Sequence, residues 1–584
     1  MQVKNTEIPS QKELEREINQ YLSRKYGDRV RVISAPFIQP KVEKKQEKSF
    51  AERILSKINF NLKPQELIAY LDQYVVKQEA AKAILATKIC THFNRIKYWL
   101  KHRRNTLNRI NYIKNNILMI GPTGVGKTFM IKLIAQKLGV PFVKGDATKF
   151  SETGYVGGDI EDLVRELVHQ ADDDIELAQF GIIYIDEIDK IASSGNFLGP
   201  DVSRTGVQRA LLKPMEETEV DLKTPFDPIS QLETIEHYRR TGKKERLVIN
   251  TRHILFIMSG AFNGLEDIVK QRLHQQEIGF GANITSKKEK KSYLPYVKAE
   301  DLIKYGFESE FIGRLPVIAV FERLETEDLY QILKNPNSVV VNAKKQDFRA
   351  YDIDLVFEDQ AFTFFAQKAA EEGTGARALV SVLERTLLPF EKTLPSTEVK
   401  KLVITKEVAA NPKQALCEIL KGDWKTTITK RFEQALEAEK SHLRQVITAK
   451  GKELAAQYNL HLTPQRIEVI VNEYEKFGYD LDFAFQEMAR YIHQIRIFVQ
   501  DFQRETGLTC QLSEEAQDKL LTQAIVEGRD IMVLCQNIIQ NLEFGLKVIR
   551  EKTGQSSFEI TLDALDNPEG YVRRLIREFY GKNV

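Results

Sequence analysis

Cysteine is scarce in this 584-residue chain, and neither sign of charge is in clear excess. The four cysteines, Cys90, Cys417, Cys510 and Cys535, form no CxxC pair, so the sequence predicts neither a zinc site nor a disulfide framework. Lysine and arginine number 85 against 82 aspartates and glutamates, which argues against a polybasic nucleic-acid coat and an acidic tail protein. No basic stripe is interleaved with aromatic residues, and we expect no nucleic-acid partner.

Long apolar runs are also missing. No stretch approaches the ~18 apolar residues that a membrane-spanning helix needs, and residues 1–17 lack the apolar segment of a secretory signal. We therefore expect a cytoplasmic protein with no membrane partner. A hydrophobic content of 42% is enough for packed cores and excludes a wholly disordered chain.

What is present is an alternation of short apolar segments and helical stretches. Residues 115–120 form a short, apolar, β-branched run, which predicts a buried strand, and residues 141–146, 181–187 and 252–260 predict further short buried strands. Helical patterns lie between them, so the fold class is α/β with a parallel sheet. After about residue 325 the pattern becomes mostly helical.

The first chemical motif follows the first predicted strand. It is a GxxxxGKT loop that opens a helix, and its members are Gly121, Pro122, Thr123, Gly124, Val125, Gly126, Lys127 and Thr128. Glycines let backbone N–H groups converge on phosphate oxygens, and the helix N-terminus favours negative charge. We predict an ATP site in which Lys127 reaches the β- and γ-phosphates and Thr128 holds Mg²⁺.

The second motif is a pair of acids at the end of the strand predicted at 181–187. Asp186 would bind Mg²⁺ directly or through water, and Glu187 would orient and deprotonate the attacking water. Two such acids could also serve only to cap the next helix. The phosphate loop upstream favours the catalytic interpretation.

From about residue 62 to residue 412 the chain resembles the AAA+ unfoldases of the ClpX/HslU group. Besides the two motifs above, the resemblance rests on residues 149–167, 201–216, 253–269, 301–317 and 373–379. It implies a large P-loop α/β domain, a mostly helical small domain and a ring-shaped homo-hexamer that couples ATP hydrolysis to pulling on protein substrates. The chain lacks the zinc-binding N-terminal domain of ClpX, which makes it a divergent ClpX-like member.

The resemblance also assigns residues around the nucleotide. It makes Arg314 the arginine finger that reaches a neighbouring subunit's γ-phosphate, and Arg377 the sensor-2 arginine. It places Tyr74, Val75 and Val76 around the adenine ring. Ser259 lies near the end of the sensor-1 strand.

Two further segments match loops that the family uses to contact its substrate and its peptidase. Tyr155 and Val156, within a GYVG sequence, match the pore loop that grips the substrate. Ile278, Gly279 and Phe280 match the loop that docks a ClpP-type peptidase. A chance tripeptide is the alternative for the second match.

The helical region contains an internal repeat. Residues 358–388 align without gaps with residues 513–543, and similar β-like stretches follow both. Met532 stands where Arg377 stands in the first copy, and no second phosphate loop precedes it. We therefore expect a degenerate small-domain fold without ATPase chemistry.

The predicted organisation has four parts. They are a variable N-terminal segment and linker at 1–60, a large ATPase domain at 61–325, a small domain at 326–412 and a helical C-terminal extension at 413–584. The predicted function is that of an ATP-dependent unfoldase and translocase feeding a ClpP-type peptidase. The alternative is a protease-independent chaperone or remodeller.

Overall fold

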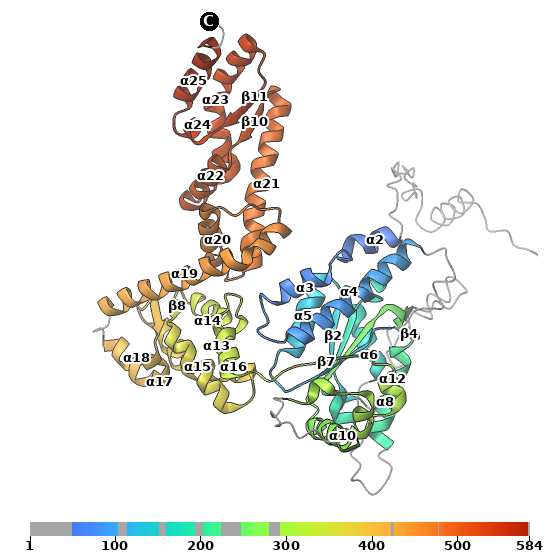
Figure 1. The fold of residues 1–584 in the computed structure, drawn as a ribbon. Coiled ribbons are helices and arrows are strands. Elements are labelled where there is room, and N and C mark those ends of the chain that lie inside the picture. The colour runs from blue at the N-terminus through green and yellow to red at the C-terminus, as the bar shows by residue number, and fades with distance from the viewer. Residues whose placement is uncertain are drawn as a thin grey trace, which may run out of the picture. The chain divides into compact units, whose positions relative to one another are not determined.

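A computed structural model of the chain describes residues 50–102, 114–150, 159–192, 202–222, 247–279, 292–421, 425–476 and 478–581 (Figure 1). It divides into two units, Met1–Arg53 and Ile54–Val584. The second unit starts a little before the boundary predicted at residue 61, because Ile54, Ile58 and Phe60 are buried.

A five-stranded parallel sheet forms the centre of the large domain, in the order β2-β3-β6-β1-β7. The strands are β1 (Ile117–Ile120), β2 (Phe142–Asp146), β3 (Ile182–Asp186), β6 (Leu255–Gly260) and β7 (Val317–Val320). The α/β class and the four predicted strands are confirmed. β1 and β6 are buried along their whole length, because helices cover both faces of a parallel sheet.

Helices and short turns surround this sheet in the large domain. They are α2 (Phe50–Lys57), α3 (Pro64–Leu71), α4 (Glu79–Lys101), α5 (Lys127–Leu138), η3 (Ala147–Lys149), α6 (Ile160–His169), α7 (Ile175–Ala178), η4 (Ile188–Ile191), α8 (Val202–Met215), η5 (Thr251–His253), α10 (Leu265–Gly279), η6 (Leu294–Tyr296), α11 (Ala299–Tyr305) and α12 (Ser309–Gly313). A small antiparallel pair joins β4 (Glu219–Asp221) to β5 (Val248–Asn250).

The small domain is mostly helical, as predicted. It contains α13 (Thr326–Lys334), α14 (Val339–Arg349), β8 (Asp354–Phe357), α15 (Asp359–Glu372), α16 (Ala376–Thr393), η7 (Leu394–Ser396), β9 (Lys401–Ile404), α17 (Lys406–Ala410) and α18 (Pro412–Lys421). β8 and β9 pair in parallel. The boundary predicted at residue 412 falls on the first residue of α18.

The C-terminal extension repeats this fold, which confirms the predicted second copy. Its elements are α20 (Pro464–Lys476), α21 (Leu481–Thr506), β10 (Thr509–Leu512), α22 (Glu514–Glu527), α23 (Ile531–Thr553), β11 (Ser557–Ile560), α24 (Leu562–Asp566) and α25 (Pro568–Gly581). β10 and β11 also pair in parallel. The helix pair α20–α21 corresponds to α13–α14, so the repeat begins further upstream than the sequence alignment.

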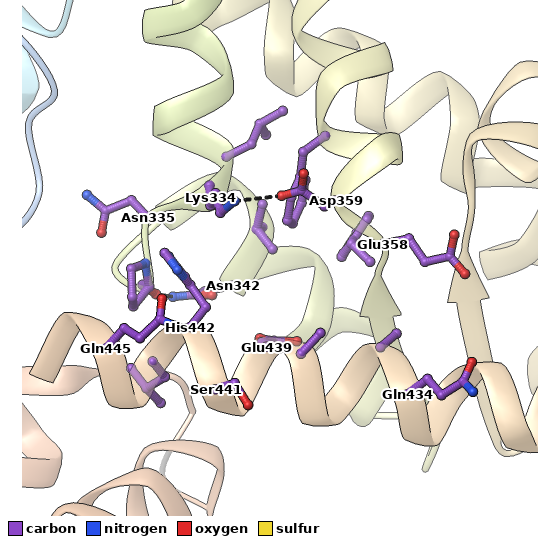
Figure 2. Close-up of a pocket in the computed structure, with 18 of the residues that line it drawn as sticks. Lys334, Asn335, Asn342, Glu358, Asp359, Gln434, Glu439, Ser441, His442 and Gln445 are labelled. Atoms are coloured by element: carbon purple, nitrogen blue, oxygen red, sulfur yellow. Dashed lines mark hydrogen bonds and ion pairs between the residues drawn. The ribbon is translucent and has the colours of Figure 1, made fainter.

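Helix α19 (Lys425–Gln457) connects the two copies. Phe432 and Ala435 on this helix pack against Val356 of β8 and Val403 of β9, so α19 covers one face of the two-stranded sheet. A cavity of about 590 Å³ lies between α19 and the small-domain helices, and Figure 2 shows residues that line it. Among the described residues, no helix has the length and apolar character required to cross a membrane.

Candidate active site

The phosphate-loop sequence connects β1 to α5. Gly124 and Gly126 have φ values of +74° and +91°, which glycine adopts without steric penalty. Gly124 also has no room for a side chain, since a Cβ there would lie 2.0 Å from the carbonyl oxygen of Thr374. The loop therefore depends on glycine both for its backbone conformation and for contact with the small domain.

Lys127 begins α5 and is only 8% exposed. Its Nζ donates to the carbonyl oxygens of Gly121 and Pro122, at 2.5 and 2.7 Å. Burial lowers the pKa of Lys127 to about 8, and the charges of Asp186 and Asp189 act in the opposite direction. Lys127 is thus a buried cation within the loop, suited to a phosphate group.

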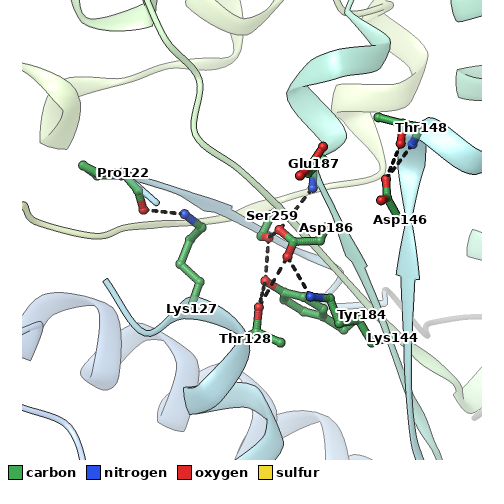
Figure 3. Close-up of polar contacts among 10 residues, drawn as sticks. All are labelled: Pro122, Lys127, Thr128, Lys144, Asp146, Thr148, Tyr184, Asp186, Glu187 and Ser259. Carbon is green, nitrogen blue, oxygen red and sulfur yellow. Dashed lines mark hydrogen bonds and ion pairs between the residues drawn. The ribbon is translucent and has the colours of Figure 1, made fainter. Parts of the chain in front are cut away.

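Asp186, at the end of β3, is the hub of a polar network (Figure 3). Ser259 Oγ donates to its Oδ1 at 2.6 Å, and Thr128 Oγ1 donates to its Oδ2 at 3.4 Å. Lys144 Nζ lies 3.1 Å from the same Oδ2. Burial opposes ionisation of Asp186, but the bonds from Ser259 and Lys144 outweigh it and hold its pKa below the ordinary value.

The sheet order explains why Ser259 meets Asp186. β3 and β6 are neighbours and Ile185 pairs with Met258, so the next residues along both strands lie side by side. Tyr184 lies in the same strand as Asp186. Its hydroxyl is hydrogen-bonded to Thr128 Oγ1 at 2.9 Å and to Ser259 Oγ at 2.6 Å. These side chains form one connected network across three elements.

The oxygen ligands at this site fit a magnesium ion. The hydroxyl of Thr128 and the carboxylate of Asp186 are hard oxygen ligands, and Thr128 Oγ1 lies 3.4 Å from Asp186 Oδ2. Mg²⁺ is usually held by only one or two protein groups, with water and phosphate oxygens completing its shell. The pair matches that pattern.

Glu187 follows directly and has a left-handed backbone, with φ of 56° and ψ of 31°. It caps η4 and is exposed, while its backbone N–H donates to Asp186 Oδ1 at 3.1 Å. A non-glycine residue in this region costs on the order of 1–3 kcal/mol. Because of this backbone conformation, the two consecutive acids differ in solvent exposure: Asp186 is half-buried and Glu187 is exposed.

The small domain contacts the loop through the 373–377 segment. The N–H of Ala376 donates to the carbonyl oxygen of Gly124 at 2.8 Å. Arg377 follows at the start of α16 and is exposed. Burial is the main cause of the lowered pKa of Lys127, and the positive charge of Arg377 lowers it further. Arg377 therefore faces the same site as Lys127.

The 74–78 segment is held against the strand that ends at Val320. Gln78 donates from Nε2 to Glu322 O at 2.8 Å and accepts from Glu322 N at 2.7 Å. Val75 is buried, and the ring of Tyr74 lies 5.2 Å from that of Tyr70. Tyr74, Val75 and Val76 are therefore fixed relative to the sheet.

Other predicted residues lie outside this network. Arg314 caps α12, is half-exposed and forms an ion pair with Glu216 of the same chain. Ile278 and Gly279 are the last two residues of α10. Tyr155, Val156 and Phe280 lie outside the described residues.

Sequence reasoning missed three residues that the structure brings to the site: Lys144, Tyr184 and Asp189. Tyr184 was visible as a polar interruption in an apolar strand. Asp189 is buried and accepts from the N–H groups of Ala261 and Phe262, both at 3.3 Å, which fixes the turn after β6. The position of Asp189 in the sequence gave no sign that it would bond to the backbone of Ala261 and Phe262.

Comparison with known proteins agrees with this geometry. A family described as "AAA domain (Cdc48 subfamily)" matches residues 113–318, and the C-terminal D2-small domain of ClpB matches residues 324–394. A relative from Borrelia duttonii, "ATP-dependent Clp protease ATP-binding subunit ClpX", is 39% identical over 355 residues, covering 60% of this chain and 78% of the relative. The protein of that name from Treponema denticola is 39% identical over 353 residues, covering 60% and 81%.

Proposed function

Because the chain belongs to the ClpX family of AAA+ ATPases, we propose that it threads protein substrates through the central pore of a ring-shaped hexamer and delivers them to a ClpP-type peptidase. That the chain is an ATPase of the unfoldase type follows from its AAA domain and its ClpX relatives. The observation that carries the proposal is the convergence of Lys127, Thr128 and Asp186 at one edge of the parallel sheet.

The described residues suggest the following roles in hydrolysis. Lys127 binds the β- and γ-phosphates of ATP, while Thr128 and Asp186 hold Mg²⁺, which neutralises phosphate charge when bound. Glu187, exposed beside Asp186, orients the attacking water and accepts its proton. Ser259 keeps Asp186 ionised and in position.

Two arginines would complete the site. Arg377 adds positive charge from the small domain of the same chain, and this charge acts on Lys127. Arg314 would act on the nucleotide of a neighbouring subunit, after exchanging its ion pair with Glu216 for the γ-phosphate. Its half-exposed position suits a group that serves another subunit.

Peptidase docking would use Ile278, Gly279 and Phe280. The elements on either side of this segment are locked together, since Arg272 on α10 donates to both carboxylate oxygens of Asp301 on α11, at 2.7 and 2.9 Å. Both side chains are buried. A fixed base of this kind supports a loop whose apolar residues must enter clefts on a partner.

A protease-independent chaperone or remodeller is the second candidate. The C-terminal extension favours it, because neither matched family reaches beyond residue 394 and the second copy holds its own core. Such a module could select the complexes to be remodelled.

Cosedimentation with a ClpP-type peptidase, in the presence of a slowly hydrolysed ATP analogue, separates the two candidates. The chain should sediment with the peptidase, and Phe280→Ala should abolish this binding while sparing ATPase activity. Phe544→Ala is the matched control, because Phe544 is 81% exposed on α23 of the second copy. Absence of binding under every nucleotide condition would favour the remodeller.

A further inference from the structure

The turn between α13 and α14, residues 335–338, is hydrogen-bonded to the large domain. Asn335 Nδ2 donates to the carbonyl oxygen of Gln73 at 2.9 Å, and Asn337 Nδ2 donates to the same oxygen at 3.5 Å. Asn335 Oδ1 also accepts from the N–H of Asn337 at 2.9 Å, which stiffens the turn. Gln73 directly precedes the Tyr74–Val76 segment.

The same turn is bonded on its other side to the C-terminal extension. Asn337 Oδ1 accepts from the N–H of Leu481, at the start of α21, at 3.4 Å. The hydroxyl of Tyr474 on α20 donates to the carbonyl oxygen of Pro336 at 2.6 Å. Asn337 is buried, and its single amide joins the extension to Gln73 of the large domain.

Helix α14 reinforces this junction. Asn342 Nδ2 donates to Pro336 O at 2.7 Å and to Tyr479 O at 2.9 Å, while Gln346 Nε2 donates to Gly478 O at 2.7 Å. Asn335, Asn342 and His442 gather at one end of the cavity in Figure 2. The loop between α20 and α21 is therefore held by several specific bonds.

The extension also reaches the large domain directly. Burial chiefly raises the pKa of Tyr74, and the charges of Asp480 and Asp482 in the extension raise it further, so both carboxylates lie near the tyrosine. Lys137, near the end of the helix that begins at Lys127, donates to Gln457 Oε1 at 3.1 Å.

We propose that the C-terminal extension is coupled to ATP binding through the 335–338 turn, and that Asn337 is the positioning residue in this coupling. Its amide joins that of Asn335 on the carbonyl oxygen of Gln73, and the bond from Leu481 holds Asn337 in this position while the extension is docked. The docked extension thereby helps to fix Gln73 and, through it, the segment that frames the adenine. This inference rests on the proposed adenine-framing role of Tyr74, Val75 and Val76. By thermodynamic linkage, a change that loosens the docked extension weakens ATP binding, and ATP strengthens the docking in return.

Tyr474→Phe tests the coupling in the full-length protein, because it deletes one hydroxyl at the junction and leaves the ring in place. The matched control is Tyr571→Phe, in which an equally buried tyrosine loses a hydroxyl that donates to Glu559 O at 2.7 Å within the second copy. We expect Tyr474→Phe to raise both the KM for ATP and the Kd of a fluorescent ATP analogue by roughly two- to fivefold. The value of kcat should stay within about twofold, and the control should match the parent protein.

Asn337→Asp provides a second test. An aspartate at this position still accepts from the N–H of Leu481 but cannot donate to Gln73 O, so KM should rise without loss of the extension's docking. Unchanged KM and Kd in both Tyr474→Phe and Asn337→Asp would overturn the coupling. Failure of the unfoldase proposal would be distinct, since the parent protein would then hydrolyse ATP without unfolding or degrading a protein substrate.

Discussion

Gly375 lies so close to Gly124 that Gly375 has no room for a side chain. A Cβ on Gly375 would be 2.8 Å from the carbonyl oxygen of Gly124, which also accepts a hydrogen bond from Ala376. In the second copy Asp530 takes the place of Gly375, with φ of −65°, and caps α23. The second copy therefore lacks the glycine that lets the first copy approach a phosphate loop.

Gly375→Ala should impair ATP hydrolysis, because the new methyl group would push the small domain away from the loop. Gly373→Ala is the control: its φ of +68° is similar to the +64° of Gly375, but its Cβ would meet nothing within 4 Å. Gly373→Ala should lose on the order of 1 kcal/mol of stability from its left-handed backbone, and Gly375→Ala more, because its ψ of −143° lies close to a region that essentially only glycine adopts. Only Gly375→Ala should raise the KM for ATP or lower kcat, by about tenfold or more, in steady-state assays. Equal activity in the two variants would contradict the packing argument.

Glu187→Gln should stop hydrolysis while leaving ATP bound. The amide cannot accept a proton from water, whereas Thr128 and Asp186 keep the magnesium ligands. General-base removal typically costs on the order of 10²–10⁴ in rate. Measured kcat should fall by that amount, with the Kd for ATP nearly unchanged. Turnover at the parental rate would show that Glu187 is not the base.

Ser259→Ala should weaken magnesium-dependent activity. It removes the 2.6 Å hydrogen bond to Asp186 and the bond with Tyr184, so the pKa of Asp186 should move up toward its ordinary value. Loss of such a supporting partner typically costs about 10–100-fold in metal affinity or activity. Titration of ATPase activity with Mg²⁺ measures the effect. Thr386→Val, which removes a buried hydroxyl bonded to Val382 O in α16, should leave the titration unchanged.

The pH dependence of kcat/KM should report Lys127. Burial lowers its pKa to about 8, so in the free enzyme the ammonium is protonated below that pH and is lost as the pH rises through it. We expect kcat/KM for ATP to fall above about pH 8, because the neutral amine attracts phosphate weakly. Lys127→Arg, which cannot deprotonate in this range, should show lower activity but no such decline. If kcat/KM declined in the same way at alkaline pH in both proteins, the titrating group would be one other than Lys127.

Glu473 should destabilise the extension at neutral pH. Its side chain is fully buried, no hydrogen bond reaches either oxygen within the described residues, and the ammonium of Lys476 is 3.7 Å from Oε1. Burial raises the pKa of Glu473 in the folded protein. The free-energy cost of ionising it is therefore absent at acid pH and grows as the pH rises above the pKa that Glu473 has in the unfolded chain. Glu473→Gln should therefore raise the melting temperature at pH 7 and have a smaller effect near pH 5. A melting temperature lowered at pH 7 would mean that the carboxylate stabilises the fold.

Much of the fold could be predicted because its signals are local. The strands at 115–120 and 181–187 are short apolar runs bounded by polar residues, and the glycine-rich loop lies between strand and helix. The internal repeat was visible because the same helical spacing recurs in both copies. The helix pair α20–α21 escaped detection, since α21 is much longer than α14 and the two share only their place in the packing.

The candidate site was predictable only in part. Lys127, Asp186 and Glu187 belong to recognisable motifs, but Asp189 and Lys144 have no motif of their own. Their partners depend on which strands are neighbours and on how the turn after β6 folds back.

The sequence by itself determined the alternation of strands and helices, the phosphate-loop glycines and the two consecutive acids, because each depends on residues adjacent in the chain. Only the tertiary structure decided that Ser259 bonds to Asp186, that Gly375 must be glycine and that Asn337 joins the extension to Gln73. Those contacts join residues far apart in sequence. A hydrogen bond requires its donor and acceptor atoms to lie within about 3.5 Å, and only the packing of whole elements brings them that close.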